Sequence, residues 1–414
     1  MTSPKTVGTG RLLTLILPAT FGMYAVYQGV QNILLPAAVE EFDPARKVAN
    51  LAVITILFSI ASTIALPLGG ALSDRTRSRF GRRTPWLAGS AVAAVAILAG
   101  LTQADGIVLL AVGCTLLWFV LNLYQAAITA VLPDRVPTER RGFASSIIGL
   151  ATPLGVLIGV NLASRVSREA GYLLLGALFL VLAAAFVFGA PEGPSPDVRP
   201  APETGGEKQT WAKRAAGFFA SFKNGDFTLA FVSRALLFLA YFTVGGYMYY
   251  ILQDHIGTDN LPGGDIAVAV STVTSISVVV WVATSVVFGY LADKLNRRKL
   301  FVGISSAGMG CALAVPLLWP TWAGMLVYAV VGGLFFGIYI AVDLALMSLV
   351  LPDKQREGRD MGVLAVATAG AQILSPAIAG GLITLFNGYS PLFAFGAVCA
   401  IGGGLLAFRI RGVR

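Results

Sequence analysis

The amino-acid sequence predicts an all-α polytopic membrane protein with twelve transmembrane helices in two pseudo-symmetric six-helix bundles. Three observations lead to this fold class. The composition is poor in charge, apolar runs of about 20 residues recur along the chain, and pairs of motifs repeat at one fixed spacing. Each observation restricts the possible architectures in a different way.

The composition excludes soluble proteins. Of the 414 residues, 56% are hydrophobic and only 12% are charged, whereas soluble proteins carry about 25% charged residues. So little charge cannot cover the surface of a cytosolic enzyme or a secreted domain, and the chain is too apolar to be disordered. An outer-membrane barrel is excluded as well, because its strands would alternate polar and apolar residues in segments of about ten.

The apolar runs divide into two groups of six. We expect an N-terminal bundle in residues 1–190, a cytoplasmic linker in residues 191–226 and a C-terminal bundle in residues 227–414. The seventh span is predicted over Phe227–Leu252. The linker is the only long polar segment, and its Pro, Gly and Glu content is typical of a flexible connection.

The end of this linker contains a stripe of apolar residues at helical spacing. The stripe consists of Trp211, Ala215, Phe218, Phe219 and Phe222. It indicates a helix lying on the inner membrane surface. The alternative is an ordinary lead-in to the seventh span.

Basic residues define the expected orientation. The net charge is +9, and 25 of the 30 Lys and Arg residues fall in loops on one side of the predicted spans or in the two termini. Basic loops face the cytoplasm, so both termini and the linker should be cytoplasmic, in a protein of a bacterial inner membrane. This distribution accounts for the excess of positive charge, so the sequence does not indicate a nucleic-acid partner.

The sequence offers no material for a metal or cofactor site. The three cysteines, Cys114, Cys311 and Cys399, lie in apolar runs and lack metal-ligand spacing, and His255 is the only histidine. We therefore expect no catalytic residues, no metal and no cofactor, and the chain is not predicted to be an enzyme.

An internal repeat supports the two-bundle architecture. The loop after the second span reads Gly70-Ala-Leu-Ser-Asp74-Arg, and the loop after the eighth reads Gly289-Tyr-Leu-Ala-Asp293-Lys. The fourth and tenth spans both end in Leu-Pro-Asp, at Asp134 and Asp353. Both pairs are 219 residues apart, as expected for two parallel halves.

These motifs resemble the hallmark loops of the major facilitator superfamily. The first copy, which runs from Ser73 to Trp86 and includes Gly81-Arg-Arg83-Thr-Pro, is similar to the loop of glycoside–pentoside–hexuronide cation symporters and the related sucrose transporters. The resemblance covers the topology of the whole chain. It implies the major facilitator fold, transport by alternating access, and a central cavity lined by the first, fourth, seventh and tenth helices.

The two loops are predicted to form a conformational latch. Asp74 is expected at the end of a helix, where a carboxylate is unfavourable against the helix dipole unless it is paired. Nearby arginines offer partners, and such a cluster can hold one conformation and release another. The alternative is that the arginines only anchor the topology. The predicted latch residues are Gly70, Asp74, Arg75, Arg79, Arg82, Arg83, Gly289, Asp293, Arg297 and Arg298.

Polar and aromatic residues within the spans predict a solute site. Side chains at membrane depth that can form hydrogen bonds usually face a cavity or another helix. Amides and aromatic rings suit a neutral, hydroxyl-rich solute, and the alternative is hydrogen bonding between helices without a ligand. The candidates are Tyr24, Tyr27, Gln28, Gln31, Asn32, Asn122, Gln125, Tyr241 and Tyr249.

A single carboxylate is expected deep within a span. Asp343 lies in the tenth span at a depth similar to that of Arg234 in the seventh. Because an unpaired charge there is costly, Asp343 must be paired, protonated or hydrated. We predict that it couples transport to protons, with Arg234 as its partner; the alternative is transport without a coupling ion. The second span has no acidic residue before Asp74, which disfavours the sodium site of melibiose-type symporters.

The sequence therefore predicts a proton-coupled transporter of a small organic solute, with a sugar or glycoside as the leading substrate class. The alternative is a proton-coupled exporter of drugs, natural products or other lipophilic solutes. It rests on the fifth span, where Gly149, Pro153, Gly155 and Gly159 loosely resemble the glycine–proline motif of drug–proton antiporters. Expected partners are the solute, protons and the lipid bilayer, and we expect a monomer.

Overall fold

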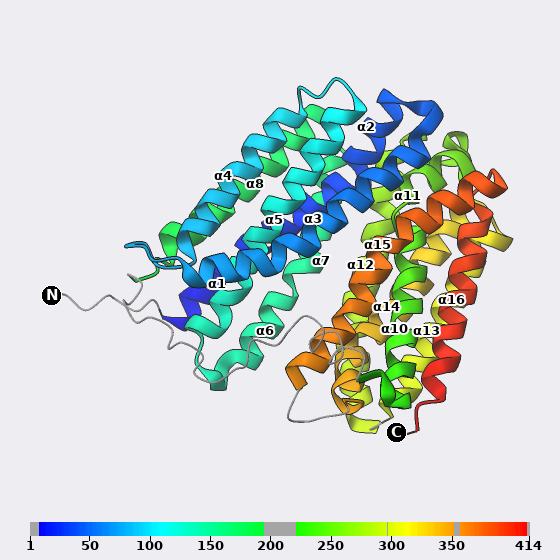
Figure 1. The fold of residues 1–414 in the computed structure, drawn as a ribbon. Helices are drawn as coiled ribbons and strands as arrows, with labels where there is room; N and C mark the ends of the chain where they lie inside the picture. Colours follow the sequence, from blue (N-terminus) through cyan, green and yellow to red (C-terminus); the bar gives the residue numbers. More distant parts are fainter. Residues whose placement is uncertain (1–7, 194–220, 296, 352–356, 412–414) are drawn as a thin grey trace. The chain divides into compact units, whose positions relative to one another are not determined.

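The structure, a computed structural model, describes residues 8–193, 221–295, 297–351 and 357–411. Every regular element in these ranges is helical, and twelve helical segments are long and apolar enough to cross a membrane (Figure 1). Many large apolar side chains on the helices are exposed, as expected for surfaces that face lipid. The predicted all-α fold with twelve spans is confirmed.

The chain forms two compact units, residues 1–198 with 270–275 and residues 199–269 with 276–414. The helices of residues 1–198 are α1 (Thr9–Gly29), α2 (Leu35–Phe42), α3 (Lys47–Arg75), α4 (Thr84–Leu101), α5 (Ile107–Arg135), α6 (Arg141–Gly149), α7 (Ala151–Ala163) and α8 (Arg168–Gly189). Short 3₁₀ turns at Pro44–Arg46 and Thr138–Arg140 precede α3 and α6.

The later part of the chain repeats this order. Its helices are α10 (Gly225–Gly245), α11 (Met248–Tyr250), α12 (Ile266–Leu295), α13 (Arg298–Leu318), α14 (Trp322–Leu349), α15 (Glu357–Phe386) and α16 (Ser390–Phe408). Single 3₁₀ turns lie at Ser221–Lys223, Thr258–Asn260 and Pro262–Gly264.

Equivalent helices pair in the same way in the two halves. In the first half, α1 packs on α7 and α8, and α4 packs on α5 and α8. In the second half, α10 packs on α15 and α16, and α13 packs on α14 and α16 (Figure 1). The repeated motifs in the sequence therefore correspond to a repeated packing arrangement.

The first and seventh spans both change helix type near one end. Residues Val30–Leu34 form a π-helical segment between α1 and α2, and residues Ile251–Gly257 form another after α11. Such segments are often found at functional sites. The seventh span is not the continuous helix predicted over Phe227–Leu252, because α10 ends at Gly245. The adjacent Gly245 and Gly246 explain the break, since glycine is a weak helix former.

Most of the predicted linker, including the stripe from Trp211 to Phe219, lies outside the described residues. Phe222 is described, and its ring packs on Phe227 and Phe231 at centroid distances of 5.8 and 4.9 Å. At this residue the structure agrees with the alternative of a lead-in to the seventh span.

Candidate functional site

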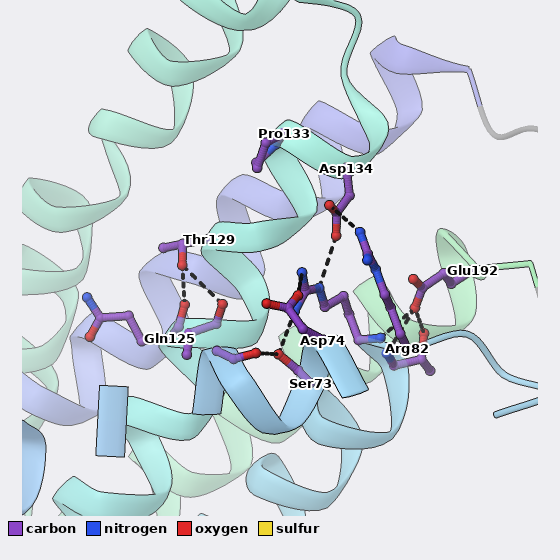
Figure 2. Close-up of polar contacts among 12 residues, drawn as sticks. Ser73, Asp74, Arg82, Gln125, Thr129, Pro133, Asp134 and Glu192 are labelled. Atoms are coloured by element: carbon purple, nitrogen blue, oxygen red, sulfur yellow. Dashed lines mark hydrogen bonds and ion pairs between the residues drawn. The ribbon is translucent and has the colours of Figure 1, made fainter. Parts of the chain in front are cut away.

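The strongest cluster of charges in the first unit surrounds Arg83, at the start of α4. The Arg83 guanidinium lies 2.5 Å from Asp74 Oδ1 through Nη2 and 3.0 Å from Asp134 Oδ2 through Nε. Its Nη1 donates to Ser73 Oγ at 2.5 Å. Arg82 Nη2 contacts the second oxygen of Asp134 at 2.5 Å. Figure 2 shows the carboxylates around the arginine side chains.

Glu192, just after α8, completes this cluster. Its Oε2 accepts hydrogen bonds from the backbone N–H groups of Arg83 and Thr84, at 2.8 and 3.2 Å (Figure 2). The first turn of α4 has no cap from its own N-cap side chain, so a carboxylate from 108 residues further along the chain satisfies these donors. We call Ser73, Asp74, Arg82, Arg83, Asp134 and Glu192 the Arg83 cluster.

Two features of the surrounding residues position Glu192. Arg135, at the end of α5, donates to the carbonyl oxygens of Ala190 and Pro191 at 2.8 and 3.2 Å. Gly81 has φ of 91°, and a Cβ atom there would overlap the Glu192 side chain. Position 81 therefore requires glycine for two reasons: the backbone has a positive φ, and the Glu192 side chain occupies the space of a Cβ atom.

The remaining residues of the predicted latch lie outside the Arg83 cluster. Arg75 is exposed, and Arg79 stacks on the ring of Phe80 at 4.7 Å. The adjacent glycines Gly69 and Gly70, at the end of α3, differ in their surroundings. A Cβ on Gly69 would lie 3.0 Å from α5, whereas a Cβ on Gly70 would meet no described atom within 4 Å.

The second copy of the motif has fewer contacts than the first among the residues that the structure describes. Arg298 Nη2 lies 3.2 Å from Asp293 Oδ1, and the Asp293 side chain is 73% exposed. Arg297 is exposed, and a Cβ on Gly289 would only reach ordinary contact with Ala341, at 3.8 Å. Asp353, the counterpart of Asp134, lies outside the described residues.

An ion pair lies inside the second unit. Arg234 Nη1 on α10 is 2.5 Å from Asp343 Oδ2 on α14, and their side chains are only 14% and 4% exposed. Arg234 Nε also donates to Thr368 Oγ1 on α15 at 2.9 Å. Within the described parts of the chain, the other oxygen of Asp343 has no hydrogen-bond partner. The ion pair and the bond to Thr368 thus join three helices.

Aromatic rings extend from this ion pair across three helices. The Arg234 guanidinium lies 5.4 Å from the ring of Phe238, which contacts Tyr339 edge-on at 6.0 Å. Tyr241 stacks on Phe336 at 4.3 Å with an interplanar angle of 9°. Trp281 of α12 meets the same Phe336 at 5.3 Å.

Tyr249, another candidate for the solute site, is on the short α11, and its ring lies 5.9 Å from that of Tyr250. It belongs to the irregular part of the seventh span and not to the aromatic group around Phe336.

The predicted polar residues of the first span are partly paired with one another. Asn32 Nδ2 donates to Gln28 Oε1 at 2.7 Å, and Asn32 lies with Gln31 in the π-helical segment. Tyr24 Oη and Gln125 Nε2 approach to 3.5 Å from α1 and α5. These groups satisfy part of their hydrogen-bonding capacity inside the first unit.

Two other candidates of this unit are buried between helices. Asn122 donates to Ser62 Oγ at 2.9 Å and to the Trp118 carbonyl at 2.8 Å. Tyr27 packs edge-on against Trp118 at 5.3 Å. For Asn122 the contacts match the alternative of hydrogen bonding between helices.

Comparison with known proteins identifies the family. The model of the Major Facilitator Superfamily matches residues 16–270 and 230–414, which together span nearly the whole chain.

The chain belongs to the major facilitator superfamily.

Solved structures of this superfamily have the same fold. A bacterial homolog of the human lysosomal transporter Spinster, in an inward-facing and unoccupied conformation, is 13% identical with a TM-score of 0.66; the match covers 96% of this chain and 93% of the other. A variant of the nucleoside transporter NupG is 15% identical with a TM-score of 0.74, covering 96% and 99%. The peptide transporter POT in complex with sulfate is 14% identical with a TM-score of 0.71, covering 98% and 95%. No curated protein matches the sequence.

The protein is therefore a multi-pass membrane transporter and not an enzyme. In the described ranges, no group of three His, Cys, Asp or Glu side chains is placed to hold a metal ion. Membership of the glycoside–pentoside–hexuronide or sucrose branch stays a prediction, because the matched model describes the superfamily as a whole.

Two glycines of the glycine–proline motif in the fifth span lie at a close helix contact, whereas a Cβ atom on Gly149 would meet no described atom within 4 Å. A Cβ atom on Gly155 or Gly159 of α7 would overlap atoms of α1. The close approach of α1 and α7 thus accounts for Gly155 and Gly159, as expected for small residues that permit helix packing.

Several residues of the site had no assigned role in the sequence analysis. Asp134 had a signal, because it ends the repeated Leu-Pro-Asp motif. Glu192 lies in the predicted linker, and Thr368 is one threonine among many apolar residues. Nothing in the local sequence distinguishes these two, because both meet their partners across more than 100 residues.

Proposed function

We propose that the protein is a proton-coupled secondary transporter of a small organic solute, in which Asp343 carries the proton. The observation that supports this proposal is the buried Arg234–Asp343 ion pair, in which one carboxylate oxygen has no hydrogen-bond partner within the described part of the chain. A protonated Asp343 could donate a hydrogen bond from that oxygen, and Arg234 would keep its bond to Thr368.

Protonation at this position would change how three helices are held. The charged pair attracts α10 to α14, and a proton on Asp343 removes that attraction. If two arrangements of the helices bind the proton with different affinities, proton binding shifts the equilibrium toward the arrangement that binds it more tightly. A proton gradient can then favour one step of the alternating-access cycle.

A sugar or glycoside is the proposed solute. Gln28, Gln31, Asn32 and Gln125 provide amides, and Tyr24 and Tyr27 provide rings, in the first unit. Amides bind hydroxyl groups and rings pack on sugar faces. Tyr241 and Tyr249 are the proposed contributions of the second unit. Asn122 is retained in the proposed site, although its bonds to Ser62 and Trp118 also support a structural role.

Export of a lipophilic solute is the second candidate. The aromatic group of Tyr241, Trp281, Phe238 and Phe336 supports this candidate. Aromatic rings pack on flat apolar molecules as well as on sugars. A thermal-shift screen of the purified protein against sugars, glycosides and lipophilic cations distinguishes the two substrate classes. A ligand of the native state raises the melting temperature.

We further propose that the Arg83 cluster is the latch at the cytoplasmic end of a monomeric transporter in a bacterial inner membrane. Glu139 and Asp259 are exposed in loops that the basic-residue count assigns to opposite sides. In a chain with Cys311→Ser, cysteines at these two positions should react with impermeant reagents from opposite faces. Labelling of both from one face would contradict the topology.

The coupling proposal is tested in proteoliposomes with the solute that the screen identifies. Asp343→Asn should abolish uphill accumulation driven by a pH gradient and retain exchange of labelled for unlabelled solute. Asp105→Asn, at an exposed loop position, is the matched control and should accumulate normally. A static ion pair would instead let Asp343→Asn combined with Arg234→Gln accumulate solute with a normal pH profile, and that result would refute the role of Asp343.

A further inference from the structure

A basic cavity opens at one end of the second unit, away from the Arg234–Asp343 ion pair. Its volume is about 770 Å³, and it lies between the first turns of α10 and α13 and the residues that follow α16. The residues that line it are Gly225, Asp226, Leu229, Lys299, Phe408, Arg409, Ile410 and Arg411.

The polar part of this cavity is positively charged. Three cations, Lys299, Arg409 and Arg411, face one carboxylate, Asp226. Lys299 Nζ donates to the Ile410 carbonyl at 2.8 Å, and the Arg411 backbone N–H donates to Asp226 Oδ1 at 3.0 Å. These bonds fix the chain after α16 without using either guanidinium. Arg409 and Arg411 are exposed, and no hydrogen bond or ion pair of their guanidinium groups is found among the described residues.

Apolar side chains also line the cavity. They include Leu229 and Phe408. Phe408 is 39% exposed, and its ring lies over Gly303, where an added Cβ would approach to 2.5 Å. Along α16, Leu405 and Ile401 precede Phe408 at intervals of three and four residues, and both are exposed. An exposed apolar stripe on one helix face therefore leads away from the basic residues.

We infer that this cavity binds the headgroup of an anionic phospholipid, with the phosphate at Arg409 and Arg411 and an acyl chain along the α16 stripe. Guanidinium groups bind phosphate through paired hydrogen bonds, and basic pockets between spans on the cytoplasmic side attract anionic lipids. A free phosphate ion would use only the cations. Only an amphipathic ligand uses both the cations and the apolar side chains, and the bilayer supplies such ligands.

The experiment compares lipids that share acyl chains. Protein purified in detergent and stripped of lipid is titrated with phosphatidylglycerol or phosphatidylcholine, and binding is followed by native mass spectrometry and melting temperature. We expect stabilisation by phosphatidylglycerol that exceeds that by phosphatidylcholine. Separate titrations with inorganic phosphate and with glycerol 3-phosphate test a soluble source of the same anion.

A double variant tests the location of the site. Arg409→Ala with Arg411→Ala should weaken phosphatidylglycerol binding roughly 30-fold, since each cation near the membrane surface contributes about fivefold. Lys299 and the two backbone bonds remain, so the melting temperature without lipid should not change. The matched control, Arg77→Ala with Arg140→Ala, removes two exposed arginines from the first unit and should bind like the unmodified protein.

Three outcomes would overturn the inference. Equal binding of the two lipids would show that the headgroup charge is not recognised. Equal stabilisation by inorganic phosphate would identify a soluble anion as the ligand. An equal loss of binding in the control variant would show that the net charge, and not this cavity, attracts the lipid.

Discussion

The two copies of the arginine-rich loop begin with the same motif and end in different structures. After Asp74 the chain makes a longer loop, and Arg83 follows the aspartate by nine residues, whereas Arg298 follows Asp293 by five. Arg83 is buried and contacts two carboxylates and a serine hydroxyl. Among the described residues, Arg298 contacts one carboxylate, the exposed Asp293.

Two copies of one motif can therefore have the same backbone arrangement while their charged side chains contribute differently to stability. A buried guanidinium that loses its partners is costly, whereas an exposed pair contributes about 0–1 kcal/mol. We therefore expect the first half to carry most of the latch, and the second half to retain the charge pattern mainly at its surface.

The largest expected difference is between Arg83→Ala and Arg298→Ala. Arg83→Ala removes the cation that joins Asp74 and Asp134, although Asp134 keeps its contact with Arg82, and should destabilise the protein by about 2 kcal/mol, measured as a lower melting temperature in detergent. Arg298→Ala should change stability by less than about 0.5 kcal/mol. Arg79→Ala is the control for charge in the same loop, because Arg79 is exposed and only stacks on Phe80. Equal losses for Arg83→Ala and Arg298→Ala would remove the proposed asymmetry.

The second expected effect concerns Glu192. Glu192→Ala removes the cap of α4 and should cost about 1 kcal/mol, with faster hydrogen exchange at the backbone amides of Arg83 and Thr84, the two that it caps. Glu139→Ala, which removes an exposed carboxylate from a nearby loop, should leave these amides protected. Unchanged exchange in Glu192→Ala would mean that the cap does not stabilise α4.

The sequence predicts features that depend on local patterns better than contacts between residues that lie far apart along the chain. Helical periodicity, charge scarcity and the fixed spacing predicted the fold and the positions of both loops. The pairing of Arg234 with Asp343 could be proposed because these are isolated charges at similar depth in apolar spans. Glu192 could not be placed, because its role depends on α8 ending beside α4. Gly69 and Gly70 could not be distinguished either, since only the rotation of α3 decides which one faces α5.

The stability of the second half should depend on pH through His255. This residue is the only histidine in the sequence, and it lies outside the predicted spans. Burial lowers the pKa of His255, and this effect is opposed by a hydrogen bond to the backbone of Pro316. With a lower pKa in the folded state, the unfolded chain binds more protons near and below the ordinary value of 6.5. Stability from this group is therefore present above that pH and falls as the pH decreases. His255→Gln should reduce the loss of melting temperature between pH 7.5 and 5.5, and an unchanged pH dependence would contradict this account.

The smallest expected effect is the coupling between Asp293 and Arg298. A double-mutant cycle with Asp293→Asn and Arg298→Gln should give an interaction energy below about 0.5 kcal/mol, because water screens a pair in which the carboxylate is 73% exposed. The equivalent cycle with Asp134→Asn and Arg83→Gln should give a coupling of about 1 kcal/mol or more, because the Asp134 carboxylate also receives a contact from Arg82 and the Arg83 side chain is only 6% exposed. High salt should reduce the first coupling further and change the second less, since buried pairs are screened less. A coupling above 1 kcal/mol between Asp293 and Arg298 would mean that the two loops are energetically alike. The latch would then have to be assigned to both halves.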